Sequence, residues 1–372
     1  MTVNIREVSC KGDYKKFVNF LYKHYKGEDN WIPPIKSDEF FSIDKEKNPA
    51  YEFCESSFWL AEDDGKVVGR VGAIINHSYN DKVGVKYGRI NRIEFNDDKE
   101  ISSLLFKTAE SWIKEKGMEK VHGPLGFTNI DQQGLLIEGF DYLPSIASVY
   151  NHAYYQKHFE DLGYEKENDW LEFRLTIGDK ISQKAIRGSA LIKKRFGFES
   201  VNFTKSSELK PYSKIIFEIL NDAFKELPYT VPFTDKMIEA SAKKYFSILN
   251  PKFVKIVKKD DEVIGFFVGL PSLSKAMKKA NGRVFPFGIL PIMKSLKHPE
   301  VIDMLLTGVK EEYQSNGVAV ILIAELQAEM LKHGIDQMET TGMFETNHTA
   351  IANWKNYEHI QHKKRRCYVK DL

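Results

Sequence analysis

The segment from Gln314 to Ala319 combines residue types that can hold an anion. It lies between a predicted strand that ends at Val309 and a predicted helix that begins at Gly317. The first N–H groups of a helix have no partner inside the helix, and the helix dipole adds positive potential there. A glycine lets a ligand approach this backbone, although it could instead relieve a crowded turn. The residues predicted to surround an anion are Gln314, Ser315, Asn316, Gly317, Val318 and Ala319.

A second group of polar and aromatic side chains follows a long loop, residues 123–150. Loops of this length inside a compact domain are often functional. Two interpretations remain open: a wall of a substrate or acyl-chain pocket, and a self-packed loop that joins two parts of the chain. His152 and His158, which follow the loop, could take part in acid–base chemistry. The residues predicted to contact a substrate are Tyr150, Asn151 and Tyr155.

Several classes of protein are disfavoured by what the sequence contains. Cys10, Cys54 and Cys367 lie far apart, which argues against a zinc finger or disulfide scaffold and fits a reducing compartment. No spacing of His, Cys and carboxylate residues is typical of a metal site. The N-terminus lacks an apolar signal core, and the run from Val318 to Ala324 is far shorter than the ~20 residues of a membrane helix. We therefore predict a cytoplasmic protein without a metal.

The composition predicts a globular chain of about two domains. It has 372 residues, of which 42% are hydrophobic, and a formal net charge of +2. Such a small charge gives no global field to recruit nucleic acid or an anionic membrane, although local patches remain possible. The basic run Lys363–Arg366 most simply alternates across a closing strand, because no aromatic platform for nucleic acid accompanies it. We expect neither a nucleic-acid partner nor a membrane partner, and the oligomeric state stays open.

The same order of elements is predicted in both halves of the chain, from apolar residues spaced for strands or helices. The first half has predicted strands at 3–8, 58–62, 67–75, 87–95, 118–122 and 170–175, and predicted helices at 13–25, 101–116 and 152–162. The second half has predicted strands at 200–204, 253–258, 263–270, 301–309, 337–341 and 363–369, and predicted helices at 212–227, 234–249, 317–332 and 348–357. The expected domains are residues 1–178 and 199–372, joined by a Lys-rich connecting segment at 179–198.

The anion site carries a resemblance to a known family. Gln314-x-x-Gly317-x-Ala319 resembles the Q/R-x-x-G-x-G/A motif that binds the acyl-CoA pyrophosphate in GNAT acyltransferases. Glu345 to Ala350, which includes Asn347, resembles a second signature, where a helix follows the splayed fifth strand. The resemblance covers residues 203–369 and extends weakly over the first half. It implies an α/β fold of two tandem GNAT-like units, each with a mixed, mostly antiparallel sheet flanked by helices.

The first half resembles a GNAT unit mainly in its element order and in the segment from Asn151 to Glu165. Its pyrophosphate position departs from the family, because the acidic segment Asn96–Glu100 stands where the glycine loop belongs. Carboxylates at a helix N-terminus satisfy the dipole themselves and repel a pyrophosphate. The first unit is therefore predicted to be degenerate. The pairing of such a unit with a better-preserved one, and the block from Gly123 to Asn151, resemble bacterial two-unit GNAT-like proteins.

The resemblance implies an N-acyltransferase that uses acetyl-CoA or another acyl-CoA as co-substrate. CoA would lie in the second unit, with Val309 and Asn347 added to its contacts, and a small-molecule or peptide amine would be held between the units. Asp303 stands near the family's usual basic carboxylate and is the predicted general base. Trp354 occupies the place of the family's acidic Tyr, so Tyr357, about one helical turn later, is the predicted acid.

Alternatives remain for the whole protein and for single residues. Trp354 and the acidic first loop are also compatible with a non-catalytic acyl-CoA-binding or scaffold protein that has a decayed site. A Fem-like aminoacyl transferase also pairs two GNAT-like units, but its long helical arm has no convincing counterpart here. Asp303 could be a structural carboxylate and Tyr357 a core residue. Asn347 could simply cap the helix that follows it.

Overall fold

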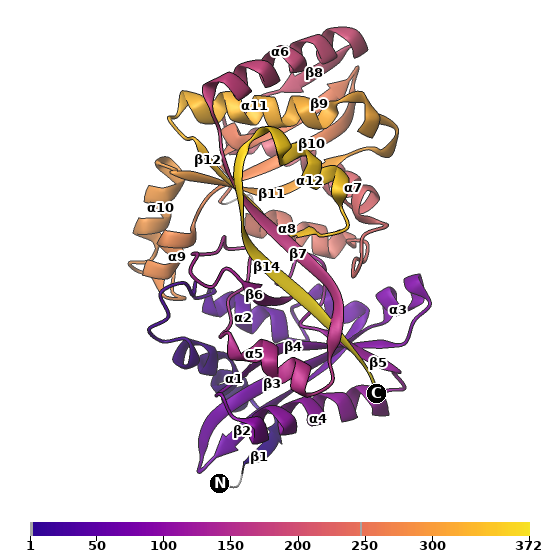
Figure 1. Ribbon diagram of the computed structural model, residues 1–372, viewed down its shortest axis with the longest axis vertical. Coiled ribbons are helices and arrows are strands. Elements are labelled where there is room, and N and C mark those ends of the chain that lie inside the picture. Colours follow the sequence, from indigo (N-terminus) through magenta and orange to yellow (C-terminus); the bar gives the residue numbers. More distant parts are fainter. Residues whose placement is uncertain (1–2, 246–247) are drawn as a thin grey trace. The chain divides into compact units, whose positions relative to one another are not determined.

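The computed structural model describes residues 3–245 and 248–372, which form two units (Figure 1). Unit 1 consists of Met1–Leu171, Met277–Ile289 and His362–Leu372, and unit 2 consists of Glu172–Ala276 and Leu290–Gln361. Each unit contains a mixed sheet and several helices, as the sequence predicted. None of the described helices is long and apolar enough to cross a bilayer.

The unit boundaries differ from the expected limits, 1–178 and 199–372, because two long strands pass from one unit to the other. Strand β7 (Glu165–Thr176) begins in unit 1 and ends in unit 2, and β14 (Glu358–Asp371) begins in unit 2 and ends in unit 1. The expected connection at 179–198 is helix α6 (Asp179–Phe196) of unit 2, which ends at Gly197 in the left-handed conformation. Its lysines belong to a helix rather than to a linker.

The sheet of unit 1 has the strand order β1-β2-β3-β4-β5-β14-β7. Among the strand pairs of this unit whose register is described, β4 and β5 are parallel and the others are antiparallel. Its strands are β1 (Asn4–Glu7), β2 (Cys54–Asp63), β3 (Lys66–Asn76), β4 (Tyr87–Phe95), β5 (Lys120–Gly123) and β6 (Leu135–Glu138). Its helices are α1 (Lys11–His24), α2 (Lys36–Ile43), α3 (His77–Val83), α4 (Lys99–Glu115) and α5 (Tyr154–Asp161), with the short η1 (Pro49–Glu52).

The sheet of unit 2 repeats this plan with the order β8-β9-β10-β11-β12-β7, and β11 and β12 are its parallel pair. Its strands are β8 (Phe198–Val201), β9 (Val254–Lys259), β10 (Glu262–Pro271), β11 (Val301–Val309), β12 (Gln337–Thr340) and β13 (Met343–Phe344). Its helices are α6, α7 (Ser213–Phe224), α8 (Asp235–Tyr245), α11 (Val318–Lys332) and α12 (His348–Ala352). It also contains α10 (Ile289–Lys297) and the 3-10 helices η2 (Ser206–Tyr212), η3 (Pro251–Phe253), η4 (Glu311–Asn316) and η5 (Asn353–Asn356).

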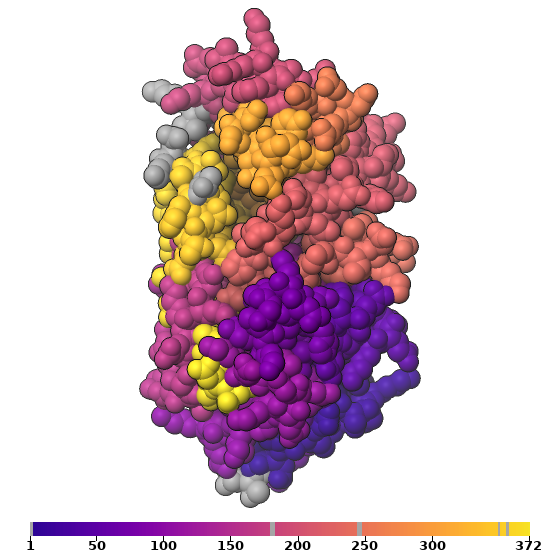
Figure 2. Space-filling model, turned by 90° about the vertical axis from the view of Figure 1, so that its right-hand side faces the viewer, coloured from indigo at the N-terminus to yellow at the C-terminus, as the bar shows by residue number. Residues whose placement is uncertain are grey.

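Helix α11 explains why unit 2 needs α6. Its sequence begins Val-Ala-Val-Ile-Leu-Ile-Ala, and buried side chains lie on more than one side of it. A helix that is apolar on several faces must be covered on all of them. The sheet strands β9 and β10 cover one side, and α6 packs along another (Figure 1). In Figure 2 the pink residues of α6 lie above the light orange residues of α11.

In unit 1 a glycine brings α4 close to the sheet. The buried face of α4 includes Ile101, Leu105, Ala109 and Ile113, at helical spacing. A Cβ atom at Gly88 of β4 would lie 2.3 Å from the Cγ2 atom of Ile113, which is far too close for any side chain. Glycine is therefore required at this position for the helix and sheet to approach as they do.

The long loop at 123–150 packs into unit 1 through its own backbone. Arg89 donates to the Gly126 carbonyl at 2.9 Å, and Asn91 donates to the Leu125 carbonyl at 2.9 Å. Strand β6 of the loop pairs with β14, where Lys363 and Arg365 are buried and the two basic residues beside them are half-buried. The basic run alternates as predicted, and these contacts favour the interpretation of a self-packed loop.

The strongest periodic patterns gave the most accurate element limits, and β4 and β11 match their predicted ranges. The helix predicted at 348–357 is divided into α12 and η5. The helix predicted at 234–249 corresponds to α8, and its predicted course through residues 246–247 lies outside the described residues. The elements that the sequence patterns did not indicate are α2, α3, α6, β6, β13, α9 (Ser274–Ala280), α10 (Ile289–Lys297) and the 3-10 helices.

Asp169 and Arg366 form a buried ion pair between β7 and β14 inside unit 1. The guanidinium donates to both carboxylate oxygens, at 2.8 and 3.0 Å, and the Asp169 side chain is fully buried. Burial alone raises the pKa of Asp169, but hydrogen bonds from Arg366 and Lys166 outweigh it and hold that pKa below its usual value. The carboxylate is therefore charged and depends on its partners.

Replacing Asp169 with Asn should lower the free energy of unfolding by about 3 kcal/mol, because the Arg366 guanidinium loses its buried counter-charge. Urea unfolding followed by circular dichroism measures the change. The control is Asp371→Asn, which removes the exposed pair with Lys120 (2.9 Å) and should cost less than about 0.5 kcal/mol. Equal losses in the two variants would contradict the importance of burial.

Candidate functional site

Strands β11 and β12 part after a short parallel ladder. Four residue pairs join them, from Val301–Gln337 to Met304–Thr340, and β11 then continues to Val309 without β12 beside it. On its other side β11 pairs with β10, where the register shifts so that Leu305 is an extra residue. The result is a bulged strand that has one edge open from residue 305 onward, where an extended ligand can pair with the backbone.

The predicted anion loop follows β11 directly. Residues 311–316 form the 3-10 helix η4, and Gly317 then begins α11 in the left-handed conformation with φ of 78°. The first hydrogen bond of α11 runs from the Ile321 N–H to the Gly317 carbonyl, at 3.2 Å. The amides of Val318, Ala319 and Val320 therefore precede the helical ladder and are available to an anion.

Gly317 is also required for packing within unit 2. A Cβ atom at Gly317 would lie 2.8 Å from the Ile192 Cδ1 atom of α6. Its positive φ and this close contact both exclude larger residues. The Gln314 side chain points back and donates to the Val309 carbonyl at 3.3 Å, which holds the loop together. Ser315 is exposed, and Asn316 is half-buried.

The cationic side chains around this loop are paired with carboxylates. Lys225 contacts Glu311 at 2.7 Å and Asp222 at 3.1 Å, and Lys310 forms an ion pair with Glu262. The hydrogen bonds that the two lysines donate to these carboxylates raise the pKa of Lys225 and of Lys310. The positive potential that remains for a bound anion therefore comes mainly from the start of α11.

Asp303 lies on β11, two residues before the bulge, and is 1% exposed. Among the described residues, neither carboxyl oxygen of Asp303 has a hydrogen-bond partner of good geometry. The Ser272 hydroxyl lies close enough to lower the pKa of Asp303, against the effect of burial. Burial raises the pKa of Asp303 well above its usual value, and the nearby charges of Glu339 and Glu172 raise it further. Asp303 therefore holds a proton more tightly than an ordinary carboxyl group.

Glu339 and Glu172 complete a buried acidic cluster that sequence patterns did not indicate. Glu339 on β12 stands opposite Asp303 in the parallel register, and Arg174 of β7 donates to it at 2.7 Å. Glu172 lies two residues before Arg174 and is 1% exposed. Strands that are buried on both faces are usually apolar, so an acidic residue within a short buried strand is unusual. This is the signal that could have located Glu339 and Glu172.

Tyr357 lies at the start of β14 and contacts α11 rather than the acidic cluster. The buried Gln327 amide of α11 donates to the Tyr357 hydroxyl at 2.6 Å. Burial raises the pKa of Tyr357, and the bond from Gln327 partly offsets this rise. The Trp354 ring lies 6.0 Å from the Tyr357 ring, and its indole N–H has no acceptor among the described residues.

Asn347 acts as the N-cap of α12. Its side-chain oxygen accepts from the Ala350 N–H at 3.1 Å. The structure thus places the predicted residues of unit 2 in three settings. Gln314 to Ala319 surround the start of α11, Asp303 lies in the acidic cluster, and Tyr357 and Asn347 flank α12 and η5.

Comparison with known proteins connects this geometry to a family. Residues 214–357, which include β11, the anion loop and α11, match the model of the acetyltransferase (GNAT) family. A tandem GNAT protein from the clavulanic acid biosynthesis pathway has the same fold, with a TM-score of 0.56 and 11% identity over 100% of this chain and 98% of that one. Residues 214–357 thus carry the sequence features of the GNAT acyltransferases, a family that uses acyl-CoA as co-substrate.

Two relatives match this chain over nearly its full length. Protein YghO of Escherichia coli is 29% identical over 378 residues, which cover 99% of this chain and 95% of the relative. A protein named bacterial ceramide synthase, from Caulobacter vibrioides, is 24% identical over 383 residues, which cover 100% of this chain and 98% of the relative. Both similarities include unit 1 as well as the segment that matches the family model.

In unit 1, the equivalent helix start is occupied by the side chains of that unit. Asp98 caps α4 and accepts from the Glu100 N–H at 2.8 Å and the Ile101 N–H at 3.2 Å. Beside it, His158 contacts Asp97 at 2.9 Å and Ser102 at 2.8 Å. Carboxylates thus take the amide donors that an anion would need, as the acidic sequence suggested. Ser102 is 1% exposed, so this Ser-His-Asp arrangement offers no accessible nucleophile.

The predicted substrate residues of unit 1 have structural contacts. The Asn151 amide accepts from the Leu136 N–H at 2.7 Å and donates to the Leu136 carbonyl at 3.1 Å, so that it pairs like a strand residue. Tyr155 is fully buried and contacts His24 at 2.7 Å. Burial lowers the pKa of His24 to about 3, and the neighbouring His152 lowers it as well. Tyr150 is half-buried and donates to Glu28 at 2.7 Å.

Among the described residues, His122, Glu167 and Cys367 could together hold a metal ion. Their donor atoms all lie within 4.8 Å of one another, and the three residues come from distant parts of the sequence. Hydrogen bonds already connect them, because Glu167 lies 3.3 Å from both the His122 Nδ1 and the Cys367 Sγ atoms. Burial lowers the pKa of His122. Glu167 thus connects the other two side chains by hydrogen bonds.

A cavity of about 240 Å³ lies beside the anion loop in unit 2. Three carboxylates face it, and Lys310 contributes the cationic side chain. A mostly acidic cavity suits a cationic amine better than a phosphate group. The residues that line it are Ile215, Glu218, Ile219, Asp222, Lys310 and Glu312.

Proposed function

We propose that this protein transfers the acyl group of acetyl-CoA or another acyl-CoA to an amine, and that unit 2 binds the CoA. The observation that carries the proposal is Gly317, which begins α11 in the left-handed conformation within the segment that matches the family. The CoA pyrophosphate would accept hydrogen bonds from the amides of Val318, Ala319 and Val320. Gln314, Ser315 and Asn316 would line its approach.

The pantetheine arm would pair with the open edge of β11 between residue 305 and Val309. An extended amide chain binds such an edge as an added strand. This position is supported by the early end of the β11–β12 ladder at Met304 and by the bulge at Leu305. Asn347, whose oxygen caps α12, would direct its amide N–H groups toward the cofactor.

The chemical step would follow from the buried carboxyl group. The amine nitrogen would attack the thioester carbonyl carbon, the new C–N bond would replace the C–S bond, and CoA would leave as a thiolate. Asp303 is 1% exposed, so the amine proton would reach it through the neighbouring Ser272 hydroxyl. A raised pKa makes Asp303 a better proton acceptor than an ordinary carboxylate. Tyr357 would give its proton to the thiolate.

The replacement Gly317→Glu should abolish acyl-CoA binding, measured by calorimetric titration of acetyl-CoA. It places a negative side chain among the amides that would hold the pyrophosphate, and we expect affinity to fall by at least about a hundredfold. The matched control is Gly317→Gln, which makes the same contact with Ile192 at the same φ of 78° without the negative charge and should keep more of the affinity. Equal binding by wild type and both variants would place the CoA elsewhere.

The replacement Asp303→Asn should lower the turnover number by about 10²–10⁴-fold and leave acyl-CoA affinity unchanged, because only the proton acceptor is lost. The free energy of unfolding of this variant should instead rise at alkaline pH. A raised folded-state pKa stabilises the protein at acidic pH, and this contribution is lost as the pH rises from the unfolded-state pKa through the folded-state pKa. The Asp303→Asn variant should therefore have the same free energy of unfolding as wild type near pH 4, and a free energy of unfolding that is higher by about 1–3 kcal/mol at pH 8.

Asp336→Asn, at an exposed position just before β12, is the control for this pair of measurements. It should change neither turnover nor the pH dependence of unfolding. A variant at Asp303 that keeps its turnover while gaining stability would assign the residue a structural role. Urea unfolding at both pH values and steady-state kinetics with one amine supply the data.

A second candidate is acylation of a long-chain amine with a long-chain acyl-CoA. The similarity over the whole chain to a protein named bacterial ceramide synthase favours it, because a ceramide is an N-acylated long-chain amino alcohol. The acyl transfer itself would be the same, and only the length of both substrates would differ. Each buried methylene group adds about 0.8 kcal/mol to binding when a pocket receives it.

Competition between acyl donors separates the two candidates. If the chain uses long substrates, palmitoyl-CoA with a long-chain amino alcohol should give a kcat/KM at least about a hundredfold above that of acetyl-CoA with the same amine. Mass spectrometry of the amide product measures both rates in one mixture. A preference for acetyl-CoA would support transfer of the short acyl group instead.

A further inference from the structure

The chain between β10 and β11 carries a basic and apolar segment that the acyl-transfer geometry does not use. From Pro271 to Pro299 it contains no Asp or Glu. It includes α9 and α10, with an irregular stretch between them. Its cationic residues are Lys275, Lys278, Lys279, Arg283, Lys294 and Lys297.

Large apolar side chains of this segment face solvent. Phe285 and Phe287 are 77% and 78% exposed, and Leu290 and Met293 are 66% and 45% exposed. Single exposed apolar residues are common on proteins, but such residues concentrated in one short stretch mark a site of interaction.

These side chains are close together because the chain itself connects them. Leu290, Met293, Lys294 and Lys297 have the spacing i, i+3, i+4 and i+7, so they share one exposed face of α10. The Cα atoms of Phe287 and Leu290 lie within ~11 Å, whatever the placement of the two units, because the chain joins them by only three Cα–Cα steps. We call Arg283 to Lys297 the basic-apolar segment.

Four of the six cationic side chains between Pro271 and Pro299 have no ion-pair partner among the described residues. Lys275 pairs with Glu300 at 2.6 Å and Lys278 with Asp29 at 3.2 Å. The remaining four have no ion-pair partner in the described part of the chain, and all four are exposed. These four are Lys279, Arg283, Lys294 and Lys297.

Within unit 1 the beginning of this segment is held in place. The Lys36 N–H donates to the Gly282 carbonyl at 3.0 Å. A Cβ atom at Gly282 would lie 2.5 Å from the Tyr22 ring and 2.9 Å from the Pro34 carbonyl, so the backbone packs tightly there. The two phenylalanines therefore project from a fixed base, which lowers the ordering cost of any contact they make.

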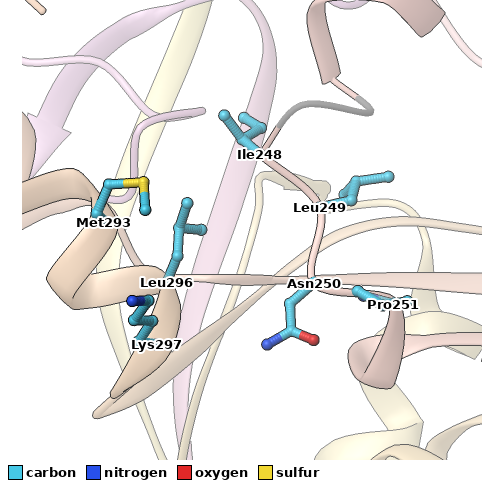
Figure 3. Close-up of a pocket in the computed structure, with 7 residues that line it drawn as sticks. All are labelled: Ile248, Leu249, Asn250, Pro251, Met293, Leu296 and Lys297. Carbon is cyan, nitrogen blue, oxygen red and sulfur yellow. The ribbon is translucent and has the colours of Figure 1, made fainter. Parts of the chain in front are cut away.

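Within unit 2 the apolar surface of α10 continues into a small hollow. Met293 and Leu296 line one side of a cavity of about 210 Å³, and residues 248–251 line the other, with Lys297 at its rim (Figure 3). Leu249 and Pro251 add apolar atoms to the same hollow. The exposed face thus has an apolar depression beside it rather than a polar border.

We propose that the basic-apolar segment docks onto the surface of an anionic lipid bilayer. Phe285, Phe287, Leu290 and Met293 would enter the headgroup and upper acyl region, and the unpaired lysines and arginine would contact lipid phosphates. A second copy of this chain fits less well, because a symmetric contact would bring the same unpaired cations against one another. The overall charge of +2 led us to expect no membrane partner, but that charge is an average over the chain.

The proposal stands on exposed side chains and holds whether or not the proposed acyl transfer is correct. Its test is flotation of the full-length protein with vesicles of phosphatidylcholine alone and of an equal mixture of phosphatidylcholine and phosphatidylglycerol. Wild type should float with the anionic vesicles, release at high salt and remain unbound with the neutral ones. No flotation with the anionic vesicles would overturn the proposal.

Two variants separate the apolar and ionic parts. The double replacement Phe285→Ser and Phe287→Ser should weaken binding to anionic vesicles at least about tenfold, as should Lys294→Ala with Lys297→Ala. The control Leu191→Ser removes another exposed apolar residue, which is 70% exposed and has Lys194 one helical turn later on α6, and this variant should bind as wild type does.

Thermal unfolding by circular dichroism verifies that each variant is folded. Wild-type binding by both double variants would overturn the assignment to this segment. A dimer that depends on Phe285 and Phe287, without vesicle binding, would assign the surface to a second copy and also overturn it. The proposal would also be overturned, in favour of a nucleic-acid surface, if the protein bound tRNA more strongly than anionic vesicles and the lysine variant lost that binding.

Discussion

The short parallel ladder between β11 and β12 is the constraint on which the rest of unit 2 depends. Parallel neighbours need a crossover, and α11 supplies it. Because the ladder ends at Met304 while β11 runs on to Val309, the helix must begin beside an unpaired strand edge. The open edge, the bulge and the unbonded amides of α11 are therefore produced together. The left-handed Gly317 allows the chain to turn from η4 into α11 while α6 packs against the same point.

The two units show how one fold retains or loses a site through a few side chains. Both have a strand, a crossover helix and a short parallel pair in the same order. In unit 2 a glycine precedes the helix, and its amides remain available. In unit 1 the Asp98 carboxylate takes those amides, and His158 and Asp97 close the same end. An N-cap carboxylate gives α4 stability, and by the same contact it removes the positive end that a phosphate group would need.

Sequence patterns predicted what depends on local spacing and missed what depends on distant residues. The strand that ends at Val309 and the glycine at 317 could be located because periodicity and glycine are local signals. Helix α6 was interpreted as a connection because its lysines obscured the face that covers α11. Glu172 and Glu339 could not be joined to Asp303, since three separate strands bring them together. The exposure of Phe285 and Phe287 is likewise a property of packing, and no spacing rule reports it.

The acidic cluster is costly for the fold, and that cost bears on its purpose. Three carboxyl groups, those of Asp303, Glu339 and Glu172, are buried in one region, and Arg174 is the cation recorded beside them. Burial and the neighbouring carboxylates of Glu339 and Glu172 raise the pKa of Asp303, so this group releases a proton less readily than an ordinary carboxyl group. Apolar residues of similar size would stabilise the same strands. Such an arrangement survives most readily where the protein needs a carboxylate that is a stronger base than usual, which is the requirement of an amine that must lose a proton during acyl transfer.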